Sequence, residues 1–199
     1  MMQRWMVERK RPDLLLFVLC LRALLWICGL DVALADHANL CNCSRHEHHT
    51  SNYDYMEGGD VRTRRLFSST QWFLIVDQHG NISGTRDPNN CYSILEIRSV
   101  SEGGVLAIKG VKSQYYICMR NNGMLYGMKE YTNSCVFKEV FLENYYTGYS
   151  SNTWKKDGKE IFISLSKKGQ PLKPKKARRE NGASHFIPRK CTQDGKTLA

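Results

Sequence analysis

The segment Trp72-Phe73-Leu74-Ile75-Val76-Asp77-Gln78-His79-Gly80 places an aromatic residue seven positions before a turn glycine. The same offset recurs in the segment that begins Tyr115-Tyr116-Ile117-Cys118-Met119 and closes on Gly123, and again in Ile161-Phe162-Ile163-Ser164-Leu165, which closes on Gly169. The three glycines are 43 and 46 residues apart. A repeat of this length indicates units that cannot bury their apolar faces alone and must pack against their copies.

Each unit predicts a hairpin, because a polar residue precedes the glycine and the run before it is rich in β-branched and aromatic residues. A second apolar run follows 14 to 17 residues after each glycine, in Ile94–Ile97, Phe137–Leu142 and His185–Ile187. Long helical periodicity is absent from this region. We therefore predict an all-β fold, a β-trefoil of twelve short strands with pseudo-threefold symmetry, because closure removes exposed strand edges. A β-sandwich with coincidental spacing is the alternative.

The first 35 residues have the pattern of a signal peptide. A basic cluster, Arg9-Lys10-Arg11, precedes two apolar runs, and Ala33-Leu34-Ala35 supplies the small residues that a signal peptidase reads, so cleavage is expected after Ala35. A retained membrane anchor is the competing interpretation, but Arg22 at mid-span makes stable membrane insertion costly. We predict a secreted, extracellular protein.

Three further parts follow the predicted signal peptide. Residues 36–60 form a polar, histidine-rich tail, residues 61–190 suffice for one domain with one core, and residues 191–199 form a C-terminal tail. The histidines near Cys41 and Cys43 match no zinc-binding spacing, so we predict neither a metal site nor a cofactor. Two sequons make Asn42 and Asn81 candidate glycosylation sites.

Six of the eight cysteines lie beyond the predicted signal peptide: Cys41, Cys43, Cys91, Cys118, Cys135 and Cys191. An even number outside the cell permits disulfides but does not assign the pairs. Cys118 lies in the middle of an apolar strand. We therefore expect it to be a buried free thiol rather than a disulfide partner.

The positive charge is concentrated near the C-terminus. The chain carries +10, and the signal segment contains five basic and three acidic residues, which leaves +8. Between Lys155 and Lys190 there are twelve Lys or Arg and three Asp or Glu, a surplus of +9. A field concentrated on one face attracts a polyanion. The candidate ligands are the cations of one loop punctuated by glycine and proline: Lys167, Lys168, Lys173, Lys175, Lys176, Arg178 and Arg179.

The compartment selects the polyanion. Nucleic acid would be the leading partner of such a loop in the cytosol, whereas a secreted protein meets sulfated glycosaminoglycan, which it binds by the same counterion release. A solvated loop without a ligand is the plainer alternative. No motif for a nucleophile elbow, phosphate loop or metalloprotease occurs, and His79 and His185 are the only histidines beyond the tail, so we predict no catalytic residues and no enzyme.

Several strings carry a family resemblance: Asn52-Tyr53-Asp54-Tyr55-Met56-Glu57-Gly58-Gly59-Asp60-Val61-Arg62, Arg64-Arg65-Leu66-Phe67, Ser93-Ile94-Leu95-Glu96-Ile97-Arg98, Ala107-Ile108-Lys109-Gly110, Gly123-Met124-Leu125-Tyr126-Gly127, Cys135-Val136-Phe137-Lys138-Glu139 and His185-Phe186-Ile187-Pro188. Together they resemble the fibroblast growth factor family, and the first string resembles its keratinocyte growth factor subfamily. The resemblance covers about residues 50–189.

The resemblance implies a secreted, heparin-binding β-trefoil mitogen that binds a fibroblast growth factor receptor tyrosine kinase together with heparan sulfate and promotes epithelial proliferation and differentiation. It places heparin on the loop from Lys167 to Arg179. It also implies a set of receptor-binding residues: Asp60, Phe67, Arg86, Glu139, Asn144, Tyr146 and Ile187. Asp60 and the residues before it would favour the epithelial splice form of the receptor.

Each of these residues has a plain structural alternative. Phe67, Tyr146 and Ile187 could be core or rim residues, Glu139 and Arg86 could be solvated charges, and Asn144 could cap a turn.

The chain departs from the family pattern in several places, including the segment that follows Tyr146 and the tail that holds Cys191. Pro174 replaces the loop's usual second glycine, and Arg189 replaces a usual apolar residue.

A secreted trefoil lectin or protease-inhibitor module is the alternative function.

Overall fold

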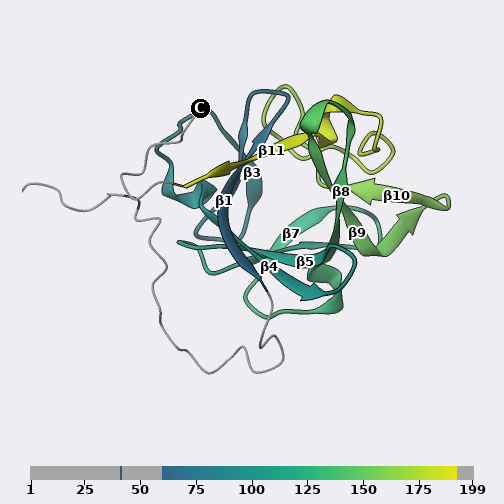
Figure 1. Ribbon diagram of the computed structural model, residues 1–199, viewed down its shortest axis with the longest axis horizontal. Helices are drawn as coiled ribbons and strands as arrows, with labels where there is room; N and C mark the ends of the chain where they lie inside the picture. The colour runs from purple at the N-terminus through teal and green to yellow at the C-terminus, as the bar shows by residue number, and fades with distance from the viewer. Residues whose placement is uncertain (1–40, 42–59, 192–199) are drawn as a thin grey trace, which may run out of the picture. The chain divides into compact units, whose positions relative to one another are not determined.

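The strands of this protein close into a barrel capped by hairpins (Figure 1). The computed structural model describes Cys41 and residues 60–191. In this part of the chain the strands are β1 (Val61–Ser68), β2 (Phe73–Val76), β3 (Ile82–Thr85), β4 (Leu95–Ser101), β5 (Val105–Gly110), β6 (Tyr116–Met119), β7 (Leu125–Met128), β8 (Val136–Phe141), β9 (Thr147–Lys156), β10 (Lys159–Phe162) and β11 (Phe186–Lys190). Short 3-10 turns are η2 (Cys91–Ser93), η3 (Asn133–Cys135), η4 (Glu143–Tyr145) and η5 (Gly182–Ser184).

Antiparallel pairing arranges six of these strands in a ring. β1 pairs with β4, β4 with β5, β5 with β8, β8 with β9, β9 with β11, and β11 with β1. Three of the remaining strands attach in equivalent places, because β2 pairs with β1, β6 with β5, and β10 with β9. β3 and β7 complete hairpins with β2 and β6. Three lobes of the same topology therefore surround one axis, which confirms the predicted β-trefoil.

The three turn glycines are equivalent in geometry as well as in sequence. Gly80, Gly123 and Gly169 have φ values of 81°, 78° and 73°, in the left-handed region that favours glycine. Each donates its N–H to the carbonyl three residues earlier, at 3.0, 2.7 and 2.9 Å for Asp77, Arg120 and Ser166 respectively. The repeat in the sequence therefore corresponds to three copies of one hairpin turn.

The third lobe differs from the prediction of twelve strands. The described residues form eleven, and in the twelfth place there is only an isolated bridge between Leu165 and Pro171. Proline has no N–H to donate and cannot extend a ladder. The hairpin still closes, because Ser166 donates its N–H to the carbonyl of Gln170 at 2.8 Å.

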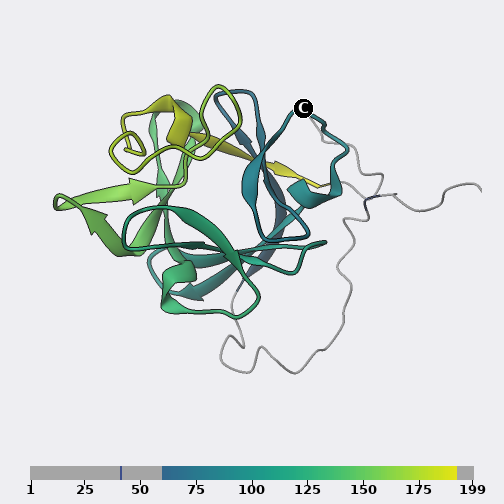
Figure 2. The same ribbon diagram turned by 180° about the vertical axis from the view of Figure 1, so that it is seen from behind.

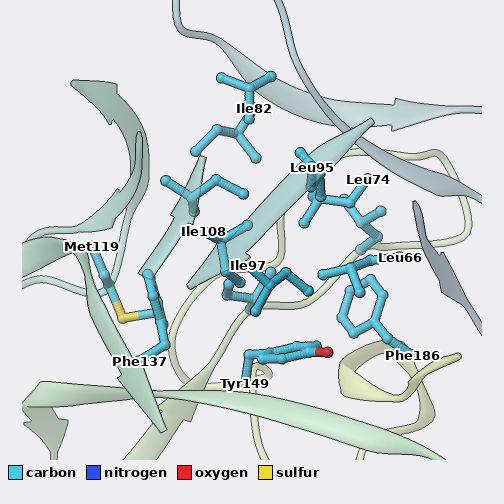
Figure 3. Packing of buried hydrophobic residues seen from close by; sticks show 14 of the residues in the cluster. Leu66, Leu74, Ile82, Leu95, Ile97, Ile108, Met119, Phe137, Tyr149 and Phe186 are labelled. Atoms are coloured by element: carbon cyan, nitrogen blue, oxygen red, sulfur yellow. The ribbon is translucent and has the colours of Figure 1, made fainter. Parts of the chain in front are cut away.

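Every barrel strand contributes an apolar side chain to the central core. The set includes Leu66, Ile97, Ile108, Phe137, Tyr149 and Phe186, all fully buried. Figure 3 shows these side chains converging on one another inside the barrel. Burial of each large apolar side chain stabilises the fold by roughly 1.5–3 kcal/mol. The rigid scaffold fixes the positions of the surface loops.

Two disulfides lie among the described residues, Cys41–Cys91 and Cys118–Cys135. The prediction that Cys118 is a free thiol is therefore wrong. Side chains alternate across a strand, so Ile117 and Met119 enter the central core while Cys118 joins a second cluster that contains Cys135. Cys191 is also disulfide-bonded. Cys43, the signal segment and most of both predicted tails lie outside the described residues.

Candidate functional site

The basic segment, Lys167 to Arg179, lies between β10 and β11 in the chain. It is beside the β2–β3 hairpin, as both views show (Figures 1 and 2). Gly84 of β3 donates its N–H to the carbonyl of Gly169 at 2.7 Å, and the indole N–H of Trp72 donates to the carbonyl of Lys167 at 3.2 Å. Buried Ala177 accepts a hydrogen bond from the N–H of Phe162 at 3.0 Å. The main chain of the segment is thus attached to the trefoil at several points.

An open hollow of about 630 Å³ lies between this segment and the first hairpin. Three cations line it, Lys167, Lys176 and Arg86. One large apolar residue, Leu172, and several polar or small residues complete the lining: Ser69, Thr70, Gln71, Ser166, Asn181, Gly182 and Ala183. No acidic side chain is among the lining residues, so the hollow presents positive charge and hydrogen-bond donors to solvent. We call it the acid-free hollow. Arg86 was predicted as a receptor residue, and the structure places it with the predicted heparin ligands.

A second hollow, of similar volume, has a mixed character. It contains three of the predicted heparin ligands, Lys175, Arg178 and Arg179, together with three acidic residues, Asp157, Glu160 and Glu180. Nearby carboxylates reduce the attraction that these cations exert on a polyanion. The seven predicted cations therefore do not form one uniform surface, and Lys168 and Lys173 are exposed outside both hollows.

Arg178 is turned toward the protein. Its guanidinium donates to the carbonyls of Glu160 at 2.9 Å, Lys159 at 3.3 Å and Lys156 at 3.3 Å. These acceptors belong to the β9–β10 hairpin, so Arg178 links the basic segment to that hairpin. Because its donors are used within the chain, Arg178 is less available to an external anion than its charge alone suggests.

The predicted receptor residues of β1 and β11 occupy one cross-strand row. Thr85 pairs with Phe73, Phe73 with Phe67, and Phe67 with Ile187. The rings of Phe67 and Phe73 are 4.7 Å apart, and Ile187 is 39% exposed. The guanidinium of Arg189 lies over the Phe67 ring, 4.1 Å from its centroid. The row therefore combines two partly exposed apolar side chains, Phe67 and Ile187, with a buried ring, Phe73, and a cation.

Tyr146 and Asn144 lie at the turn between β8 and β9, close to β11. Thr147, the neighbour of Tyr146, pairs with Phe186, and the ring of Tyr146 is 5.5 Å from that of His185. Asn144 has a left-handed φ of 57°, which asparagine tolerates better than most residues. The topology thus brings Tyr146 and Asn144 to the same region as Phe67 and Ile187.

Glu139 and Asp60 are connected through Arg62. The guanidinium of Arg62 lies 3.0 Å from the carboxylate of Glu139 and 3.6 Å from that of Asp60. Tyr149 donates its hydroxyl to Glu139 at 3.2 Å, and burial, with the negative charge of Glu139, raises the pKa of Tyr149. The Glu139 side chain is only 10% exposed, so much of its hydrogen-bonding capacity is used within the chain.

Comparison with known proteins decides the family. Residues 62–187 match the sequence model of the family described as fibroblast growth factor. The chain belongs to the fibroblast growth factor family. It is 43% identical over 195 residues to fibroblast growth factor 7 of Canis lupus familiaris, which covers 96% of this chain and all of the relative. Human fibroblast growth factor 7 is 42% identical over the same length. Human fibroblast growth factor 10 is 45% identical over 140 residues, 70% of this chain and 66% of the relative.

These similarities confirm the predicted resemblance, including the keratinocyte growth factor subfamily. The chain is a secreted fibroblast growth factor, a signalling ligand and not an enzyme. Nothing in the comparisons supports the lectin or inhibitor alternative. Among the residues that the structure describes, no helix has the length and apolar character needed to cross a membrane.

Several contributing residues of this growth factor were missed from the sequence. Gln71 and Asn181 line the acid-free hollow although they are far apart in the chain, and no local pattern marks them. Arg62 is the last residue of the first string that carries the family resemblance, but its contacts with Asp60 and Glu139 could not be predicted from the sequence. Within Cys41 and residues 60–191, no three His, Cys, Asp or Glu side chains gather as a metal ion would require.

Of the two candidate glycosylation sites, Asn81 lies among the described residues. Asn81 is exposed, and its amide Nδ2 donates to the carboxylate of Asp77 at 2.9 Å. Asn42 lies outside the described residues. Glycosylation at either site stays a prediction.

Proposed function

We propose that this fibroblast growth factor binds the ectodomain of a fibroblast growth factor receptor tyrosine kinase, in its epithelial splice form, together with heparan sulfate. The outcome is proliferation and differentiation of epithelial cells. The trefoil performs no chemistry and acts as a rigid scaffold that holds two binding surfaces. Attachment to the glycan raises the effective concentration of the ligand at the receptor.

The acid-free hollow carries the heparan sulfate part of the proposal. Lys167 and Lys176 come from the basic segment and Arg86 from the first lobe, so three cations from separate parts of the chain line one open surface. Sulfate groups accept charge-assisted hydrogen bonds from such side chains. Because bound cations release counterions from the polyanion, the affinity should fall steeply with salt. The exposed Lys168 and Lys173 extend the charged surface.

The partly exposed Phe67 and Ile187, with Tyr146 and Asn144 beside them, support the receptor part. Partly exposed aromatic and aliphatic side chains on rigid strands are the groups that act as binding hot spots. The Asp60–Arg62–Glu139 network is attached to the start of β1. We infer that this network positions the residues before Asp60, which the subfamily resemblance connects with preference for the epithelial splice form.

Two measurements test the proposal. In the first, the double variant Lys167→Ala/Lys176→Ala should elute from heparin at clearly lower salt than the control Lys155→Ala/Lys156→Ala. The control removes two exposed charges from β9, which lies away from the acid-free hollow. Equal elution of the two variants would contradict the assignment of the hollow.

In the second, receptor phosphorylation is measured in cells that express a single receptor splice form, with and without added heparin. We expect phosphorylation with the epithelial form and a stronger response with heparin. Absence of phosphorylation with every form would overturn the proposed function.

A further inference from the structure

Arg189 lies on the outer face of β11, where its guanidinium contacts the rings of Phe67 and Phe73. It is two residues from Ile187 and therefore on the same side of the strand, and the register places Phe67 opposite Ile187 and Arg65 opposite Arg189. The alternate residues of these strands, Leu66 and Phe186, are fully buried in the core. Arg189 and Ile187 thus project from the barrel on one strip, beside the partly exposed Phe67.

The position of the Arg189 guanidinium is fixed by stacking. It lies 4.1 Å from the centroid of the Phe67 ring and 5.7 Å from that of Phe73. Contact with two rings restricts a long side chain that would otherwise move freely, and the attraction between the cation and the ring faces stabilises the arrangement. Arg189 is therefore held in place before any partner arrives.

The hydrogen-bond donors of Arg189 remain available. In the described part of the chain its guanidinium makes neither a hydrogen bond nor an ion pair, although it carries five N–H donors in a planar fork. Arg178 is the contrasting case, because its guanidinium donates to three main-chain carbonyls. A stacked guanidinium with unused donors at its edge is suited to a planar, bidentate acceptor.

We propose that Arg189 is a specificity-determining residue that binds a carboxylate of the receptor ectodomain. This inference rests on the proposed function and names the chemistry that one part of the receptor must supply: an Asp or Glu side chain bordered by apolar groups. The apolar border would cover Phe67 and Ile187 while the carboxylate pairs with the fork. Pre-positioning of Arg189 lowers the entropy lost on binding.

A sulfated chain fits this position less well than a protein carboxylate. Arg189 is not among the residues that line the acid-free hollow, and its guanidinium contacts the aromatic rings of Phe67 and Phe73. The side chain opposite, Arg65, is buried, so it offers no continuous track of exposed cations for a polyanion. Arginine next to aromatic and aliphatic groups is instead typical of the centre of a protein interface.

The experiment compares three single variants of the secreted chain: Arg189→Met, Arg189→Lys and Lys190→Met. Methionine keeps an unbranched side chain over Phe67 but removes the donors, and lysine keeps the charge but removes the fork. Lys190 is the matched control, because it is the next residue, exposed, and directed to the other side of the strand. Affinity for the purified receptor ectodomain is measured without heparin at two salt concentrations, together with elution from heparin and the unfolding temperature.

We expect Arg189→Met to weaken receptor binding about 10-fold to 100-fold and to reduce its salt dependence. Arg189→Lys should fall between that variant and the native chain, and Lys190→Met should stay within about 2-fold of the native chain. If the unfolding temperature of Arg189→Met is far below that of the native chain, the receptor affinities of Arg189→Lys and Lys190→Met are compared instead. Equal receptor affinity of the Arg189 variants and Lys190→Met overturns the inference, as does a loss confined to heparin elution. Failure of the native chain to bind any receptor would instead refute the proposed function itself.

Discussion

Arg178 is the predicted heparin ligand whose structural role can be separated from its charge. Its guanidinium connects the basic segment to the β9–β10 hairpin through three carbonyl acceptors. We predict that Arg178→Ala lowers the stability of the fold, whereas it changes heparin affinity less than replacement of Lys167 or Lys176 does. The reason is that the donors of Arg178 already point into the protein.

The expected loss of stability follows from the geometry. One of the three hydrogen bonds is short, at 2.9 Å, and two are long, at 3.3 Å. A hydrogen bond to a charged group contributes roughly 1.5–3 kcal/mol and weaker ones less, and the guanidinium is only partly buried, so the sum is about 2 kcal/mol. For a domain of this size, that corresponds to a fall of about 6 °C in the unfolding temperature.

The assay is thermal unfolding together with elution from heparin, for Arg178→Ala, Arg178→Lys, Lys175→Ala and Lys176→Ala. Lys175 is the control, because it lines the same mixed hollow, is exposed and carries the same charge. Arg178→Lys should show most of the loss in unfolding temperature that Arg178→Ala shows, since lysine cannot reproduce the planar fork. It should elute from heparin close to the native chain, because it keeps the charge. An unchanged unfolding temperature for Arg178→Ala, combined with a drop in elution as large as that of Lys176→Ala, would refute the reasoning.

Three further predictions concern stability. Replacing Cys118 and Cys135 together with alanine should cost about 3 kcal/mol in chemical denaturation, because the bond closes a loop with a sequence separation of 17; a loss below about 1 kcal/mol would contradict this. Desolvation alone would raise the pKa of Asp77, but hydrogen bonds within its turn outweigh it and lower the pKa. The stabilisation that the Asp77 carboxylate contributes is therefore complete above about pH 4 and lost as the pH falls through the lowered pKa. The difference in unfolding temperature between the native chain and Asp77→Asn should then shrink in acid. A difference that stays constant with pH would count against this prediction. Gly127→Ala should destabilise by more than about 2 kcal/mol, because a Cβ would lie 2.6 Å from the Cα of Gly80 and closer still to its carbonyl oxygen. A free energy of unfolding equal to that of the native chain would disprove this.

The fold could be predicted because its signal is local and repeated. Gly80, Gly123 and Gly169 each require a left-handed φ, and each follows an apolar run at the same offset, so three copies of one turn were visible without coordinates. The pairing of Cys118 could not be predicted in the same way. Which face of a strand enters the core depends on the neighbouring lobes, and only the structure shows Cys118 directed away from the central cluster and toward Cys135.

The candidate site could be predicted only in part, for a related reason. The density of lysine and arginine along the chain indicated the basic segment, but it does not show which way each side chain points. Lys167 and Lys176 face an open hollow, whereas Arg178 turns back to the main chain. Arg86 joins the hollow from another lobe because Gly84 is hydrogen-bonded to Gly169, a contact between distant parts of the sequence.

The basic segment lies where the threefold symmetry is interrupted. In two places a glycine four residues after a turn allows close contact between hairpins: the N–H of Gly127 donates to Gly80 at 2.8 Å, and that of Gly84 donates to Gly169 at 2.7 Å. The equivalent position of the third lobe is Lys173, and there the Pro174 ring packs against Gly123 instead. A trefoil with three identical lobes would have used this main chain for a regular hairpin. Because the third lobe replaces regular pairing with a proline bridge and a longer segment, it can display lysines beside the first lobe without disturbing the barrel.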